Sequence, residues 1–326
     1  MTERENYLLA MSGQKPQWVP NFSKAVDMII PAIFISHLMT EEKRDFFSVP
    51  WTINESGPMI DCRIPPVMTD VNDWRKFVHF PDVDSFDWET ASKMQLADHD
   101  PNKAILILPN LGGGTMFMPL MNMMGFADGL CALVEEPEVC KELFAYITDF
   151  YEKCIPYVVK YYKPDVYIVG DDLCTAQNSF VSMNIYREIM KPFYQRQIDA
   201  VHRAGLPAEL HMCGKCEEYV EDFVEMGATS WQPAQGLNDI SRLQKKYGKK
   251  LIIVGTWSTD GPAEKPDATE EVVRGEVRRC LDTYAADGGV VFWDGGALGA
   301  GEDQLQRRAW VNDEMEKYGK TFYQSC

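Results

Sequence analysis

The chain has 326 residues, which is enough for one large α/β barrel or for two ordinary domains. Its formal net charge of −17 argues against nucleic acid and anionic membranes as partners, because binding phosphate groups needs a basic surface. No apolar run approaches the roughly 20 residues that span a bilayer, and residues 1–6 lack the basic start and apolar core of a secretory signal. We therefore expect a cytoplasmic protein that acts on a neutral or weakly charged small molecule.

From about residue 104 onward, short apolar segments alternate with amphipathic ones. The short segments predict strands over residues 104–109, 165–170, 207–211, 229–232, 250–254 and 290–293. The amphipathic segments predict helices over residues 136–162, 182–204 and 217–226 and from about residues 238, 269 and 302. Ser182 can cap the second of these helices and Gly205 can end it. Glycines 112–114 lack the G-x-G-x-x-G spacing of a dinucleotide-binding turn and predict a flexible loop.

Strands that alternate with helices imply parallel pairing with right-handed crossovers. About six strand–helix units follow residue 104, and the first hundred residues could supply two more. We therefore predict an α/β fold, a (β/α)8 TIM barrel formed by a single domain over residues 1–326. Residues 1–100 are rich in tryptophan and proline, which predicts an N-terminal extension that covers one barrel end and adds the first barrel elements. A doubly wound open sheet is the alternative.

Polar residues gather where the predicted strands end. In a parallel barrel, the carboxyl ends of the strands ring one mouth, where active sites lie. An open sheet would collect ligands only at its switch point and would leave several of these residues unexplained, which favours the barrel. The residues are Asn110, Asp171, Asp172, His211, Cys213, Gln232 and Asp294.

The stretch His211-Met-Cys213-Gly-Lys-Cys216 is the strongest indication of chemistry. Residues two apart on a strand project the same way, so the imidazole of His211 and the thiolate of Cys213 can converge on one ion. These ligand types are the ones that zinc prefers. A buried, satisfied pair without a metal is the alternative. Cys216 completes a Cys-x-x-Cys motif, so it could be part of a redox dithiol or could bind the metal as a fourth ligand.

Asp171 and Asp172 follow a predicted strand directly. Two adjacent carboxylates repel each other unless a cation shares them, which favours contact with a ligand or substrate. Capping of the following loop, or pairing with a basic residue, is the competing role. Asp294 could equally be a metal ligand or a structural residue. Gln232 is expected to position the substrate.

Nine cysteines are scattered along the chain, and most are expected to be buried small hydrophobes and not disulfide partners. Methionine is frequent, with 17 residues. Methionine more often fills a core than lines a site. The dense group at Met116, Met118, Met121, Met123 and Met124 is nevertheless a candidate part of the substrate pocket.

The chain resembles the uroporphyrinogen decarboxylase superfamily, and within it the cobalamin-dependent methyltransferases. The similarity covers nearly the whole length. The opening residues 4–13 look like the N-terminal signature of the family. The more specific parts are residues 170–173 (Gly-Asp-Asp-Leu) with Gln177, residues 192–194 (Pro-Phe-Tyr) and residues 210–214 (Leu-His-Met-Cys-Gly). The resemblance implies a barrel, in agreement with the order of the elements.

The decarboxylase branch binds a polycarboxylate porphyrinogen through an N-terminal motif that carries arginine. Residues 22–27 (Phe-Ser-Lys-Ala-Val-Asp) have no such arginine, so the methyltransferase branch is favoured. That branch carries a zinc-binding His-x-Cys at the position of His211 and Cys213. Members that methylate thiols take a further cysteine from the last strand, which is absent from residues 292–296 here. Asp294, with Asp171 or Asp172, would then complete the ligand set.

The resemblance implies a zinc-dependent methyltransferase. It would move a methyl group from a small methoxylated, aromatic substrate to the cob(I)alamin of a separate corrinoid-binding protein, so that cobalamin enters on a partner. We expect Asp171, Asp172 and His211 to be catalytic and His211, Cys213, Asp172 and Asp294 to bind the metal. The residues expected to bind substrate are Asn110, Gln177, Gln232, Trp257 and Trp293, with Trp231 and Phe292 as further apolar walls.

Two alternatives remain open at this point. One is transfer from methylcobalamin to a thiol or a folate, within the same branch. The other is a metal-independent lyase resembling uroporphyrinogen decarboxylase, or a non-catalytic binding barrel. The oligomeric state is open as well, with a homodimer as one arrangement.

Overall fold

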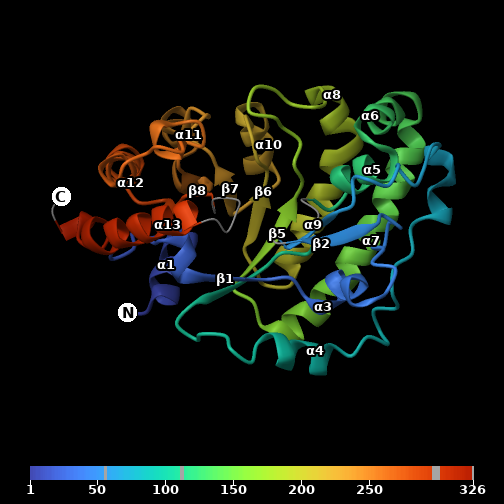
Figure 1. Ribbon diagram of the computed structural model, residues 1–326, viewed down its shortest axis with the longest axis horizontal. Helices are drawn as coiled ribbons and strands as arrows, with labels where there is room; N and C mark the ends of the chain where they lie inside the picture. Colours follow the sequence, from blue (N-terminus) through green and yellow to red (C-terminus); the bar gives the residue numbers. More distant parts are fainter. Residues whose placement is uncertain (55–56, 111–113, 296–301, 325–326) are drawn as a thin grey trace.

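The computed structural model describes residues 1–54, 57–110, 114–295 and 302–324 (Figure 1). Seven parallel strands form one curled sheet in the order β1-β4-β5-β6-β7-β8-β9. The strands are β1 (Val26–Ile29), β4 (Ala104–Ile107), β5 (Val166–Gly170), β6 (Ala208–His211), β7 (Ser230–Ala234), β8 (Ile252–Thr256) and β9 (Val290–Trp293). All six strands predicted after residue 104 are thereby confirmed.

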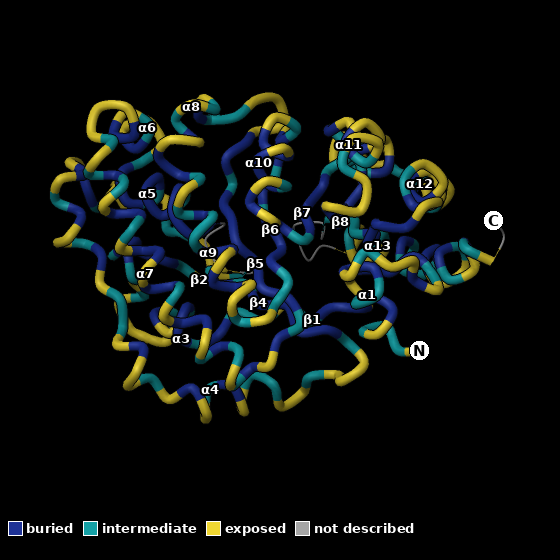
Figure 2. The backbone as a smooth tube through the Cα atoms, turned by 180° about the vertical axis from the view of Figure 1, so that it is seen from behind, coloured by how far each residue is buried: buried dark blue, intermediate teal, exposed yellow. Residues whose placement is uncertain are grey.

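Helices follow the strands and cover the outer face of the sheet. Figure 2 shows strands β4 to β9 as mostly buried and parts of α6, α11 and α12 as exposed. The α-helices are α1 (Glu3–Met11), α2 (Phe22–Ala25), α3 (Ala32–Ile35), α4 (Trp88–Gln95), α5 (Phe117–Met124), α6 (Phe126–Glu135), α7 (Pro137–Tyr162), α8 (Met183–Ile185), α9 (Lys191–Arg203), α10 (Val220–Glu225), α11 (Ile240–Tyr247), α12 (Glu270–Tyr284) and α13 (Glu302–Glu314). Short 3-10 turns and two π-helical turns, η3 (Tyr186–Met190) and η7 (Met315–Gly319), connect them.

Several predicted helix boundaries are confirmed by the local chemistry. The hydroxyl of Ser182 accepts the N–H of Ile185 at 3.3 Å, so the helical segment α8, η3 and α9 starts where the sequence predicts. Gly205 follows α9 with φ +82°, a left-handed conformation that favours glycine after a helix. By contrast, α5 and α6 were not predicted. The methionines within residues 116–124 were considered only as a candidate part of the pocket, and no element was predicted for residues 125–135.

The sheet curls so that its inner face encloses a core of its own. Leu106 of β4, Ile168 of β5, Val254 of β8 and Val291 of β9 belong to one buried cluster. Side chains from strands this far apart in the sheet meet only if the sheet bends round on itself, so the doubly wound open sheet is not what forms. Helix α1 contributes Tyr7 and Met11 to the same cluster, among others, and covers the end where the strands begin.

The sheet contains seven strands in the described ranges and not the eight of a complete (β/α)8 barrel. Beyond β9, the backbone N–H of Phe292 donates to the carbonyl of Pro20 at 2.9 Å, and Asn21 forms a single parallel bridge with Phe292. A short segment before β1 therefore occupies the place next to β9. Among the described residues before residue 100, β1 is the strand that joins the sheet, whereas β2 (Trp51–Asn54) and β3 (Gly57–Ile60) pair with each other in antiparallel fashion.

Among the described residues, no single helix is both long and apolar enough to cross a membrane. The pair α5 and α6 passes that test only when taken together, and it bends by 117° between the two helices.

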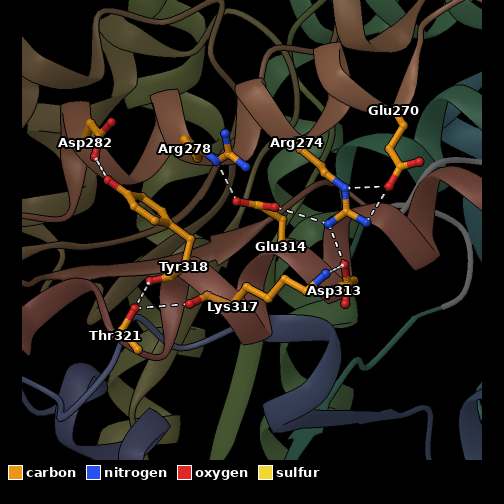
Figure 3. Close-up of polar contacts among 9 residues, drawn as sticks. All are labelled: Glu270, Arg274, Arg278, Asp282, Asp313, Glu314, Lys317, Tyr318 and Thr321. Atoms are coloured by element: carbon orange, nitrogen blue, oxygen red, sulfur yellow. Dashed lines mark hydrogen bonds and ion pairs between the residues drawn. The ribbon is translucent and has the colours of Figure 1, made fainter.

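A buried carboxylate fixes the C-terminal helix α13 to α12 (Figure 3). Glu314 is 3% exposed and accepts hydrogen bonds from Arg278 Nε at 2.6 Å and Arg274 Nη1 at 3.2 Å. Burial alone would raise the pKa of Glu314. The hydrogen bonds from the two arginines outweigh that effect and hold the pKa below its ordinary value. The contact therefore stabilises the fold while Glu314 is ionised.

Glu314→Gln should lower the free energy of unfolding at neutral pH by about 1–3 kcal/mol, because charge-assisted hydrogen bonds to a buried group are lost. A carboxyl whose folded pKa is lowered contributes fully above its ordinary pKa and loses that contribution as the pH falls through the folded value. Urea unfolding of both proteins at several pH values should show the difference shrinking in acid. Glu89→Gln, in the exposed pair with Lys93, is the control and should change nothing measurable. A difference that persists unchanged in acid would contradict this account.

Candidate functional site

Three side chains gather at the carboxyl ends of β5 and β6. One ligand atom each from Asp172, His211 and Cys213 lies within 4.8 Å of the other two. His211 Nε2 is 3.3 Å from Asp172 Oδ1 and 3.8 Å from Cys213 Sγ. Within the described ranges, this is the one group of three His, Cys, Asp or Glu residues with this spacing. A nitrogen, a sulfur and an oxygen donor together fit zinc and do not suit magnesium or calcium.

Close approach of the two strands produces this geometry. Gly170 is the last residue of β5 and pairs with His211 in β6. It has φ +140°, and a Cβ placed on it would lie 2.2 Å from the carbonyl oxygen of His211, so only glycine fits. Gly214 is equally restricted, with φ +88° and a Cβ position 2.5 Å from the carbonyl oxygen of Thr175. The two glycines let the loops after β5 and β6 lie against each other.

The charges within the cluster stabilise one another in the metal-free protein. Burial would lower the pKa of His211, but its contacts with Asp172 and Cys213 outweigh burial and raise the pKa well above the ordinary value. Burial would raise the pKa of Asp172, and the contact with His211 reverses this and lowers it. The site is therefore built to hold a positive charge beside the carboxylate, which a proton on His211 or a cation can supply.

Asp171 has a different environment from its neighbour. It is fully buried, and the backbone N–H groups of Met116, Phe117 and Met118 donate to its carboxylate at 2.8, 3.2 and 2.9 Å. The hydroxyl of Tyr194 donates to it at 2.8 Å. Burial raises the pKa of Asp171 to about 6 against these hydrogen bonds. Its oxygens are thus occupied in capping α5, so the geometry does not support the predicted catalytic role of Asp171.

A cavity of about 170 Å³ adjoins the cluster. His211 lines it, and so does Asn110, which confirms that these two predicted site residues come together. The side-chain amide of Asn110 donates to the carbonyl of Gly114. Gly112 and Gly113 of the predicted loop lie outside the described residues. Other lining residues include Leu108, Pro109, Thr115 and Ile168, so the wall is mainly apolar with a few polar groups.

The remaining predicted substrate residues do not line this cavity in the described part of the chain. Gln177 is exposed, in a turn held by the hydroxyl of Thr175. Trp293 packs on Phe22, with ring centroids 4.7 Å apart. Gln232 is buried on β7, next to His211 in the sheet. Contact of these three residues with the substrate stays a prediction.

Three of the predicted aromatic walls belong to the outer core between the sheet and the helices. Trp231 packs against Phe223 of α10, and Trp257 packs edge-on against Phe292. Along β7, Trp231 lies between Ser230 and Gln232, and alternation sends its side chain to the opposite face of the strand. Trp231 therefore faces away from the cavity, contrary to the prediction that it forms part of the pocket wall. Trp257 and Phe292 are not among the described residues that line the cavity, and their contact with substrate stays a prediction. The methionines of α5 are mostly buried in the same outer core.

Two further predicted ligands lie outside the cluster. Asp294 follows β9 and is not a member of the group formed by Asp172, His211 and Cys213. Cys216 is fully buried, and its thiol contacts the carbonyl oxygens of Cys213 at 3.0 Å and Gly214 at 3.2 Å. Burial raises the pKa of Cys216 well above its ordinary value, which disfavours the thiolate that a metal ligand requires. Of the alternatives for Cys216, the geometry fits a structural thiol.

One polar residue of the site was missed by the sequence analysis. Glu209 lies two residues before His211 on β6 and is fully buried. Its Oε2 accepts the hydroxyl of Ser230 at 2.7 Å, and burial raises its pKa to about 7. The same alternation that joins His211 to Cys213 could have identified it, since Glu209 is one step earlier on the same face.

The comparisons with known proteins agree with this architecture. The family model for uroporphyrinogen decarboxylase (URO-D) matches residues 92–301, which is more than half of the chain. The chain therefore belongs to the uroporphyrinogen decarboxylase family. None of the curated proteins matches it. Among solved structures, a methyltransferase from Methanosarcina mazei shares the fold, with a TM-score of 0.67 and 11% sequence identity over 97% of this chain and 99% of that one.

The two adjacent carboxylates should respond differently to the same change. Asp171→Asn should lower the free energy of unfolding by about 1–3 kcal/mol, because three buried backbone donors and a tyrosine hydroxyl lose a charged acceptor. Asp172→Asn should lower it less, since Asp172 caps no helix. Thermal or urea unfolding of the metal-free proteins measures both. Equal losses, or a larger loss in Asp172→Asn, would show that the roles are assigned wrongly.

Proposed function

We propose that the protein is a zinc-dependent methyltransferase that moves a methyl group from a methoxylated aromatic compound to the cob(I)alamin of a separate corrinoid protein. The observation that carries this proposal is the position of His211. It belongs to the cluster with Asp172 and Cys213 and also lines the cavity. A metal bound there would adjoin any molecule in the cavity. The fold shared with a methyltransferase and the membership of the URO-D family support the same conclusion.

Asp172, His211 and Cys213 would hold the zinc. When bound, zinc acts as a Lewis acid that stabilises the negative charge developing on an ether oxygen as it leaves. In the reaction, the bond between the methyl carbon and that oxygen breaks and a carbon–cobalt bond forms. The oxygen keeps the electron pair and gains a proton, which yields a phenol. The anionic ligands Asp172 and Cys213, with the neutral ligand His211, would together neutralise the 2+ charge of the zinc ion.

The cavity suits a small aromatic donor. An apolar cavity of about 150 Å³ is known to accommodate benzene, and about 170 Å³ is available here. Leu108, Pro109 and Ile168 would contact the ring and help to exclude water, while Asn110 and Thr115 offer polar groups that can orient it. In that orientation the methoxy group would lie beside His211.

Decarboxylation of a porphyrinogen is less well supported. A substrate with several carboxylates needs cationic side chains around it. Among the described residues that line the cavity, none is lysine or arginine. The net charge of −17 would also repel such a substrate.

The proposal predicts one zinc per chain in the purified protein and its loss in His211→Ala. Incubation of the wild type with cob(I)alamin and a set of methoxybenzenes should produce the absorbance spectrum of methylcobalamin. In His211→Ala the rate should fall at least about 100-fold, because the Lewis acid contributes several kcal/mol to the transition state. The matched control is His202→Ala, an exposed histidine on α9, which should keep both the metal and the rate.

Two results would contradict the proposal. One is a metal-free wild type that still demethylates these ethers. The other is a zinc-loaded wild type that forms no methylcobalamin with any methoxybenzene tested and instead takes up a methyl group from methylcobalamin when given a thiol.

A further inference from the structure

The inner face of the sheet below His211 carries an unusual set of polar side chains. Glu209 precedes His211 on the same face of β6, and their neighbours in β7 are Ser230 and Gln232. Glu209 and Ser230 are fully buried, and Gln232 is 1% exposed. The apolar part of the inner core includes Leu106, Ile168 and Val254. A buried carboxylate in such surroundings costs free energy unless its oxygens are hydrogen-bonded.

Only part of this set is satisfied. Ser230 donates to Glu209 Oε2 at 2.7 Å. Among the described residues, Glu209 Oε1, His211 Nδ1 and Gln232 Oε1 are all buried without a hydrogen-bond partner. Two of these atoms are acceptors. Since Nε2 of His211 faces Asp172 and Cys213, Nδ1 is the nitrogen that carries the proton when Nε2 binds a metal, and it is then a donor.

The pairing of β6 with β7 sets the three side chains next to one another on the inner face of the sheet. His211 and Gln232 are paired across neighbouring strands, which lie about 4.8 Å apart, and Glu209 is two residues from His211, at about 6.6 Å along the strand. One donor and two acceptors are what a buried water needs, because such waters make about three hydrogen bonds. A metal-bound histidine normally donates its second N–H to a carboxylate or a water in this way.

We propose that Glu209 is the positioning residue of the metal centre, and that it accepts the Nδ1 proton of His211 through one bridging water shared with Gln232. This inference rests on the proposed function, because it assigns Nε2 of His211 to the metal. Glu209 touches neither metal nor substrate. It acts by holding the imidazole in one tautomer and one orientation, with the lone pair of Nε2 directed at Asp172 and Cys213.

Tyr7 is the competing partner for Glu209. It comes from α1, its hydroxyl is also buried without a hydrogen-bond partner among the described residues, and Glu209 contributes to raising its pKa. If the free oxygen of Glu209 serves Tyr7 and not His211, the loss of Glu209 would change the stability of the protein and leave the histidine unaffected. The experiment must therefore observe His211 itself.

The test combines zinc affinity, measured by competition with a chromophoric chelator, with ¹⁵N NMR of the imidazole nitrogens. The His211 signals are identified from their absence in His211→Ala. In Glu209→Met, which keeps the volume and removes the acceptors, zinc affinity should fall roughly 10–100-fold. The tautomer with the proton on Nδ1 should also lose population in the zinc-free protein at alkaline pH. Glu209→Gln, which keeps a neutral acceptor, should be intermediate.

Glu314→Gln is the matched control, because it alters a buried glutamate far along the chain in α13 and should change neither readout. If Glu209→Met fails to fold, Gln232→Leu removes the second acceptor and should shift both readouts in the same direction, by less. The inference would be overturned, and the proposed function left intact, if Glu209→Met kept the wild-type zinc affinity and the wild-type His211 tautomer. If Glu209→Met does not fold, the same result in Gln232→Leu would overturn it. A wild type that binds no zinc would refute the metal role of His211 and the positioning role with it.

Discussion

The pairing of β5 with β6 at Gly170 and His211 is the contact on which the site depends. Because Gly170 lacks a Cβ, the two strands approach so closely that the residues after them share one small space. Alternation along the chain then separates two adjacent carboxylates. Asp171 turns back to cap α5, whereas Asp172 meets His211. The end of β5 therefore supplies both the carboxylate that caps α5 and the carboxylate that joins the cluster with His211 and Cys213.

The electrostatic balance of the cluster explains why these half-buried residues can lie together. Removing His211 and Asp172 from water separately would be unfavourable, but each shifts the pKa of the other towards the charged form. A zinc ion could supply the positive charge that this arrangement favours. Glu209 and Gln232 extend the buried polar region inward from His211.

Much of the fold and of the site could be predicted from the sequence. The parts that could not be predicted depend on contacts between segments that are far apart in the chain. Apolar periodicity located the strands after residue 104, and two-residue spacing brought His211 and Cys213 together. The same two-residue spacing could have shown that Trp231 faces the helices, because it lies between Ser230 and Gln232 on β7. It could not show that Asp171 would find three backbone donors, since these come from the start of α5, a distant segment. The predicted eighth strand is absent from the sheet in the described ranges, where β2 and β3 pair only with each other.

The most direct measurement of the central claim is zinc X-ray absorption on the zinc-loaded protein. The account predicts one sulfur scatterer at about 2.3 Å from Cys213 together with nitrogen and oxygen scatterers at about 2.0–2.2 Å from His211 and Asp172. The sulfur contribution should disappear in Cys213→Ser. A shell of nitrogen and oxygen alone in the wild type, or a sulfur signal that survives in Cys213→Ser, would place the metal elsewhere and contradict the account.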